Sequence, residues 1–123
     1  MESPFLNRQI WITQNDLAIA VRDRYPVSPG HTLVVPRRLV PTIFECTAEE
    51  MAAIWRLLAE CKAAIDAEFR PDGYNIGINC GVDAGQTIFH AHVHLIPRYR
   101  GDHPNPRGGV RHIIPGKGDY PSV

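Results

Sequence analysis

The sequence has no net charge, few cysteines and no long apolar run. Its 13 Lys and Arg residues balance 13 Asp and Glu residues, so a basic surface for nucleic acid or for an anionic membrane is not indicated. The three cysteines, Cys46, Cys61 and Cys80, form no C-x-x-C pair. Their number and spacing argue against a disulfide framework and a cysteine zinc site, and they fit a reducing cytoplasm. The longest purely apolar stretch, residues 17–21, is too short to span a bilayer, and no signal peptide is recognisable at the N-terminus.

The 123 residues are 44% hydrophobic and 21% charged, which is typical of one globular domain. We therefore expect a single domain over residues 1–123. The charge balance hides an asymmetry, because residues 1–97 carry 8 basic and 11 acidic side chains while residues 98–123 carry 5 basic and 2 acidic ones. The C-terminal segment 98–123 is basic and rich in glycine and proline.

The hydrophobic pattern predicts one long helix and several strands. Thr47 and Glu50 have the spacing of a capping box, and helical periodicity extends from Ala48 to Phe69. Strands are expected at residues 9–13, 17–21, 31–35, 74–79 and 89–96, the first two forming a hairpin and the last ending at Pro97. An extended piece is also expected at 111–114. This order predicts an α+β fold with a mostly antiparallel five- to six-stranded sheet covered by one helix.

Three of the six histidines alternate with apolar residues in the sequence HAHVHLI at residues 90–96. In a strand, His90, His92 and His94 share one face. Three neighbouring imidazoles are unfavourable in a hydrophobic core, because each buried ring nitrogen needs a hydrogen-bond partner. The row therefore indicates either a metal site of neutral imidazoles or nucleophilic catalysis at phosphorus.

The loop before the histidines, residues 81–87, favours the second chemistry. Its glycines let backbone N–H groups approach an anion, and Gln86 and Thr87 add neutral donors. No carboxylate lies between Asp83 and Asp102 to serve a zinc hydrolase. A three-histidine metalloprotein remains the alternative.

The histidine row and three further motifs resemble the histidine triad (HIT) superfamily, in its bacterial nucleotide hydrolase-like branch. The motifs are PVSPGHTLVVP at 26–36, NCGVDAGQT at 79–87, HAHVHLI at 90–96 and PRYRGDHPNPRGGVR at 97–111. The resemblance implies an α+β homodimer that cleaves nucleotide conjugates, including diadenosine polyphosphates, at the α-phosphorus. Within the same resemblance, a purine nucleoside phosphoramidase and a non-catalytic nucleotide-binding regulator are the alternatives.

The resemblance also implies catalytic roles. His92 corresponds to the nucleophile that forms a nucleotidyl-histidine intermediate, and His94 to a donor for phosphate oxygen. His90 would hold the other ring nitrogen of the nucleophile, and His31, in the sequence PGH, would support His90.

Further positions match the nucleotide-binding residues of the superfamily. Asp23 corresponds to the acid that binds the ribose hydroxyls. The residues expected to bind the phosphate groups or the sugar are Asn79, Gly85, Gln86 and Thr87.

Two weaker sets of binding residues complete the predicted site. Phe5, Ile10 and Val21 are candidate walls of a base pocket. The basic segment carries Arg98, Arg100, Arg107 and Arg111 close after the histidine strand. One or two of these, with Arg107 and Arg111 as the named candidates, are expected to contact the distal phosphates of a dinucleoside polyphosphate, because arginine binds phosphate in a bidentate manner.

No cofactor is expected for the nucleophilic step, and no residue is assigned as a metal ligand. Mg²⁺ is expected only as a companion of a polyphosphate substrate. Some members of the superfamily hold a structural zinc through an N-terminal C-x-x-C pair, but residues 2–5 contain no cysteine, so this zinc is not expected here.

Overall fold

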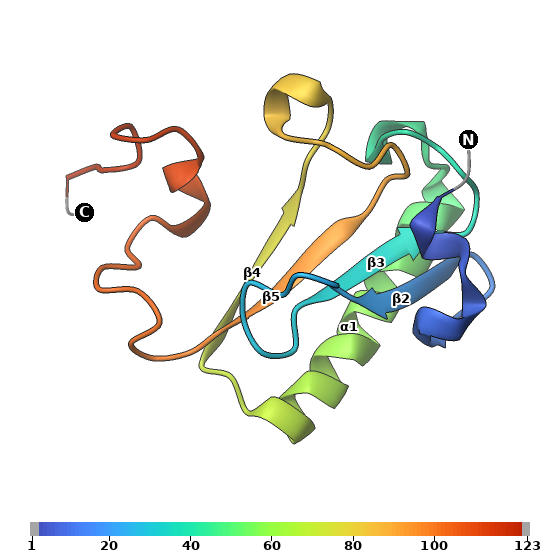
Figure 1. Cartoon of the computed structure of the whole chain (residues 1–123), viewed down its shortest axis with the longest axis horizontal. Helices are drawn as coiled ribbons and strands as arrows, with labels where there is room; N and C mark the ends of the chain where they lie inside the picture. The colour runs from blue at the N-terminus through green and yellow to red at the C-terminus, as the bar shows by residue number, and fades with distance from the viewer. Residues whose placement is uncertain (1–2, 122–123) are drawn as a thin grey trace.

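One long helix crosses one face of a five-stranded antiparallel sheet (Figure 1). The computed structural model describes residues 3–121. In spatial order, the strands are β1 (Trp11–Gln14), β2 (Ala18–Arg22), β3 (Thr32–Pro36), β5 (Val93–Arg98) and β4 (Gly73–Ile78). Every neighbouring pair is antiparallel. The predicted α+β fold is therefore confirmed, and the sheet has five strands.

The helix α1 (Ala48–Phe69) begins and ends where its sequence predicts. Thr47 accepts the N–H of Glu50, and the Glu50 side chain accepts the N–H of Thr47, so the capping box is complete. Two Arg38 donors also reach the Glu50 carboxylate, at 2.8 and 3.1 Å. This link joins the start of α1 to the connector that follows β3.

The two faces of the sheet bury different clusters. On the helix side, α1 packs against a core that includes Ala20, Val34 and Leu95. The opposite face carries a second cluster, formed by Phe5, Ile19, Val21, Leu33 and Val35. Among residues 3–121, no long helix covers this second face, which leaves it available for a site.

The observed elements differ from the expected ones in three places. The chain forms a 3₁₀ turn at Arg8–Ile10 before β1 begins at Trp11, and a further 3₁₀ turn, Gly109–Ile113, occupies most of the stretch expected to be extended. The strand of the histidine row begins only at Val93 and continues through Pro97 to Arg98. Further 3₁₀ turns lie at Pro4–Leu6, Ile43–Glu45 and Val82–Ala84.

The late start of β5 has a physical cause. The Ala91 N–H donates to the carbonyl of Val40 at 2.8 Å, so this part of the chain bonds to the connector after β3 and not to a neighbouring strand. At the other end, the pairing of β3 with β5 stops at Leu95. Pro97 therefore removes no hydrogen bond on that side of the strand.

Beyond β5, the C-terminal segment runs away from the sheet and folds as a separate lobe (Figure 1). Within residues 3–121, no helix is long and apolar enough to cross a membrane.

Candidate active site

One row of residues crosses the open face of the sheet and places His94 at its centre. The strand registers pair Val21 with Leu33, Leu33 with His94, and His94 with Gly77. Because paired residues in an antiparallel sheet point to the same face, all four share one face. Apolar side chains therefore lie on one side of His94, and a glycine lies on the other.

The His90 ring is fully buried and held at both nitrogens. Its Nε2 lies 2.6 Å from the carbonyl oxygen of Pro36, which can only accept, so Nε2 carries the proton. Its Nδ1 then accepts from the hydroxyl of Ser3 at 2.6 Å. The Ser3 oxygen in turn accepts the N–H of Phe5 at 3.2 Å. His90 is thus an anchor between the N-terminal segment and β3.

The His92 ring is fixed by the main chain. Its Nδ1 lies 2.8 Å from the carbonyl oxygen of His90, so Nδ1 carries the proton and the lone pair sits on Nε2. Phe5 packs against the ring with a centroid separation of 5.0 Å. Among the bonds of residues 3–121, none uses His92 Nε2, so the structure presents an unprotonated nitrogen of fixed orientation. The expected link from His90 to the nucleophile therefore comes from its backbone and not from its ring.

His31 supports His94, which corrects the expectation that it supports His90. The Nδ1 of His31 accepts the N–H of Val27 at 3.1 Å, so its Nε2 carries a proton and donates to Nδ1 of His94 at 2.9 Å. His94 must then hold its own proton on Nε2. The Asp23 carboxylate lies 3.4 Å from His31 Nε2. This chain of contacts makes His94 a hydrogen-bond donor beside the lone pair of His92, whose ring centroid is 5.2 Å away.

Burial lowers the pKa values of His31, His90 and His94 and keeps these three rings neutral near pH 7. Desolvation lowers the pKa of His31, and the Asp23 carboxylate partly opposes that change. Desolvation also lowers the pKa of His90. Burial, reinforced by His92 and His31, lowers the pKa of His94 to about 4. The assigned proton positions therefore describe the state at neutral pH.

A cavity of about 900 Å³ lies on the apolar side of the histidine row. Its lining includes all three predicted base-pocket residues, Phe5, Ile10 and Val21, and the predicted ribose acid Asp23. Asp23 accepts the N–H of Tyr25 through Oδ1 at 2.8 Å, which orients the carboxylate. The assignment of this cavity to a nucleoside remains a prediction, but the structure brings its four residues together.

The loop after β4 is held mainly by its own hydrogen bonds, which corrects two predicted roles. Gln86 is 3% exposed; its Oε1 accepts the N–H of Gly81, and its Nε2 donates to the carbonyls of Pro41 and Ile88. The N–H of Gly85 donates to the carbonyl of Val82. Neither Gln86 nor the Gly85 N–H is therefore free to bind a phosphate.

Two predicted phosphate or sugar ligands keep exposed side chains. Asn79, just after β4, and Thr87, after the loop, are both exposed. Within the described residues, neither side chain is used in a hydrogen bond of the fold. Their predicted roles remain open.

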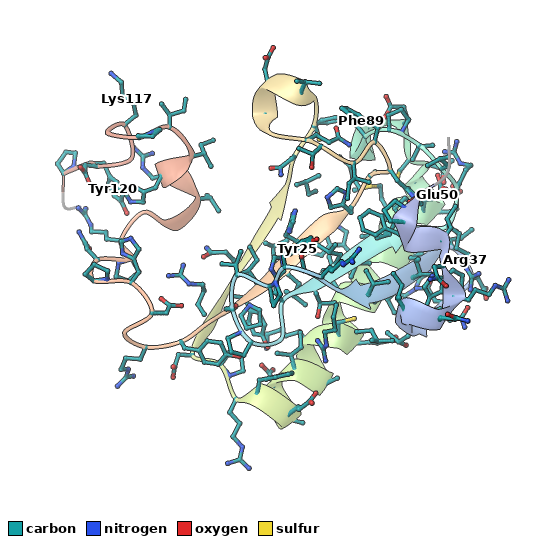
Figure 2. The ribbon with its side chains drawn as sticks, in the orientation of Figure 1. Tyr25, Arg37, Glu50, Phe89, Lys117 and Tyr120 are labelled. Atoms are coloured by element: carbon teal, nitrogen blue, oxygen red, sulfur yellow. The ribbon has the colours of Figure 1, made fainter. Side chains whose placement is uncertain are left out.

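Arg107 and Arg111 are held by contacts within the C-terminal lobe, and their predicted contact with distal phosphates stays a prediction. Arg107 donates to the carbonyls of Tyr120 and Pro121, and Arg111 donates to that of Gly118. Both guanidinium groups also contact the ring of Tyr120, at 4.1 and 4.6 Å from its centroid. Figure 2 shows Tyr120 on the C-terminal lobe, apart from the sheet. These arginines fold the lobe onto itself.

Among residues 3–121, one group has the geometry to hold a metal ion. The ligand atoms of Asp23, His31 and His94 lie within 4.8 Å of one another. The hydrogen bond between the two histidines occupies one ring nitrogen of each, so a metal would have to displace it. The expectation that no structural zinc binds rests on residues 2–5, of which Glu2 lies outside the described residues, and it stays a prediction.

Sequence reasoning missed four contributors to this site. Ser3 was noted only as a residue that is not cysteine, although its place before Pro4 and Phe5 is typical of the cap of a short turn. Leu33 and Ile88 also line the large cavity. Gly77 becomes visible only through the strand register.

Comparisons with known proteins agree with this geometry. A sequence profile of the HIT domain matches residues 7–101. The bis(5'-adenosyl)-triphosphatase of Dictyostelium discoideum is 38% identical over 104 residues, covering 83% of this chain and 69% of that protein. The asymmetrical bis(5'-nucleosyl)-tetraphosphatase of Schizosaccharomyces pombe is 41% identical over 86 residues, which cover 70% of this chain but only 47% of that protein. A crystal structure of a HIT family member from Bacillus subtilis superposes with a TM-score of 0.75 at 31% identity, covering 83% of this chain and 77% of that one.

Proposed function

Because the chain belongs to the HIT domain family, we propose that it cleaves nucleotide conjugates at the α-phosphorus through a nucleotidyl intermediate on His92. One observation carries this proposal. The Nδ1–H of His92 is held by the carbonyl of His90, which leaves an unprotonated Nε2 that makes no hydrogen bond within residues 3–121. Because no buried side-chain nitrogen among the described residues lacks a partner, this Nε2 is accessible from solvent, as a nucleophile must be.

In the proposed reaction, the lone pair of His92 Nε2 attacks the α-phosphorus, and the bond to the leaving group breaks with its electron pair. A nucleoside monophosphate group is then bonded to His92 Nε2, and the leaving group departs as an oxyanion. Water attacks the same phosphorus, the P–N bond breaks, and the proton of the water passes to solvent. His94 Nε2–H, set by the bond from His31, donates to a non-bridging oxygen on which negative charge develops.

The substrate class follows from the cavity and the relatives together. The cavity lined by Phe5, Val21 and Asp23 offers apolar walls for a base and a carboxylate for ribose hydroxyls. Two relatives are named as enzymes of diadenosine or dinucleoside polyphosphates. We therefore propose a dinucleoside polyphosphate hydrolase. Its nucleophilic step uses no metal, and Mg²⁺ would accompany only the polyphosphate chain.

We also propose that two copies form a homodimer along β4. This strand lies at one end of the sheet order, so its outer edge has no partner strand among residues 3–121. Ile76 and Ile78 are 41% and 38% exposed on the helix side of the sheet, because they pair with Leu95 and Val93 of the core against α1. A second copy would pair with the open edge through main-chain hydrogen bonds and would bury the exposed apolar side chains. Analytical ultracentrifugation, which measures the mass of the assembly, tests this proposal.

The test of the function is direct detection of the intermediate. The protein is mixed with labelled diadenosine tetraphosphate, quenched in base and digested, and mass spectrometry locates the adenylyl adduct. We expect the adduct on His92, and we expect His92→Ala to lower kcat at least about 1,000-fold. His112→Asn, in the C-terminal lobe, serves as the matched histidine control. Full activity in His92→Ala without an adduct in the parent protein would overturn the proposal.

A further inference from the structure

The histidine row divides the open face of the sheet into two sides of different character. On the β2–β3 side lie Val21 and Leu33, which line the large cavity. On the other side, β4 pairs Gly77 with His94 and Asn75 with Ile96. A Cβ atom built on Gly77 would meet no heavy atom within 4 Å. The surface beside His94 is therefore open on the side away from the cavity.

This open surface continues into a second cavity. A hollow of about 550 Å³ lies where β4 and β5 meet the C-terminal lobe. Asn75, Arg98, Arg100 and Gly109 are among its lining residues. Arg98 lies four residues after His94 on β5, which places the two residues about 13 Å apart along the strand. The two cavities thus lie on opposite sides of the histidine row.

The polar groups of this second cavity leave one cation free. Arg98 is neutralised by Asp102, with two bonds of 2.7 and 2.8 Å, and also donates to the Asn75 side chain. Arg100, in contrast, contributes only its backbone N–H, which donates to Asp72 at 2.7 Å. Within residues 3–121, no bond or ion pair uses its guanidinium group. A guanidinium group without an ionic partner beside this cavity fits an anionic ligand.

We propose that the second cavity receives the leaving half of a two-headed nucleotide substrate, with the polyphosphate chain crossing over Gly77 and the far end near Arg100. This inference rests on the proposed function, because it takes the first nucleoside to occupy the cavity beside Asp23. The missing side chain at Gly77 provides the passage, and Arg100 provides charge at its end. The arrangement selects substrates whose leaving group is long and anionic over those whose leaving group is small.

The experiment compares two substrates in the same variants. Diadenosine tetraphosphate has a long anionic leaving group, and the p-nitrophenyl ester of adenosine monophosphate has a small one. The readout is the ratio of their kcat/KM values. Gly77→Val narrows the passage without a clash, since its Cβ has free space and a β-branched residue suits a strand. We expect the ratio to fall at least about tenfold, and to fall less in Gly77→Ala, whose side chain is smaller.

Arg100→Ala tests the far end of the path independently of Gly77. We expect the ratio to fall about three- to tenfold, the size of a lost contact between arginine and phosphate. Arg56→Ala, an exposed arginine on α1, is the matched control and should leave the ratio unchanged. A ratio within about twofold of the parent value in both Gly77→Val and Arg100→Ala would overturn the inference.

A binding measurement separates this inference from the proposed function. In the His92→Ala background, calorimetry compares diadenosine tetraphosphate with adenosine monophosphate. We expect tighter binding of the tetraphosphate, and loss of that preference when Gly77→Val is added. If the parent protein hydrolyses neither substrate, the proposed function fails. If a preference for the tetraphosphate survives Gly77→Val, the path over β4 is wrong even though the nucleotide site is correct.

Discussion

Replacing Gln86 by alanine should lower the free energy of unfolding by about 3 kcal/mol, because three hydrogen bonds of a buried amide are lost and each contributes about 1 kcal/mol. The bonds are those to the N–H of Gly81 and to the carbonyls of Pro41 and Ile88. For a chain of this length, the loss corresponds to a decrease in Tm of about 10 °C. Gln86 therefore holds the loop after β4 against the connector after β3.

The assay is urea unfolding followed by tryptophan fluorescence, with kcat measured well below the transition. We expect a lower midpoint at constant m value and a kcat per folded molecule that changes less than about threefold. Gln9→Ala is the matched control, because Gln9 is exposed and its loss should change stability by no more than about 0.5 kcal/mol. If Gln86→Ala keeps the parent stability but loses kcat, the amide binds substrate and the structural reasoning is refuted.

Two further predictions concern the histidines. Ser3→Ala removes the hydroxyl that donates to Nδ1 of His90 and should lower the free energy of unfolding by about 1–2 kcal/mol. Urea unfolding measures this change, and an unchanged urea midpoint would show that the bond contributes nothing to stability. The pKa of His94 falls from its ordinary value of 6.5 to about 4 in the folded protein, so the unfolded chain binds more protons between these two pH values. The stabilisation from the neutral ring is complete above about pH 6.5 and is lost as the pH falls toward 4. His94→Gln should flatten this decline in a series of urea titrations, and an equally steep decline in the variant would contradict the assignment.

The parts of the fold that the sequence predicts well depend on local signals. The capping box of Thr47 and Glu50 lies within four residues, and it set the start of α1 correctly. Short apolar runs bounded by turn residues located β2 and β3 to within a residue. The start of β5 could not be predicted in this way, because it depends on the bond between Ala91 and the distant Val40.

The parts of the site that could not be predicted depend on distant contacts. Ser3 and His90 are 87 residues apart in the chain, and Gln86 and Pro41 are 45 apart. The motif around Gln86 indicated a polar side chain near the histidines, but only the structure shows which atoms take its hydrogen bonds. The contacts of Arg107 with a main-chain carbonyl and with the ring of Tyr120 could not be predicted for a related reason, because these partners lie 13 residues further along the chain.

The hydrogen bond that orients His92 is accepted by the peptide carbonyl of His90. This limits which mutations can remove the bond. Every amino acid at position 90 would supply the same carbonyl oxygen, so no replacement of that side chain deletes the acceptor directly. The tautomer of His92 therefore persists in any descendant sequence that keeps the path of the main chain between residues 90 and 92. Inactivating mutations that spare His92 should concentrate among the residues whose side chains hold this path, such as Val40, whose buried side chain fixes the main chain that accepts the Ala91 N–H.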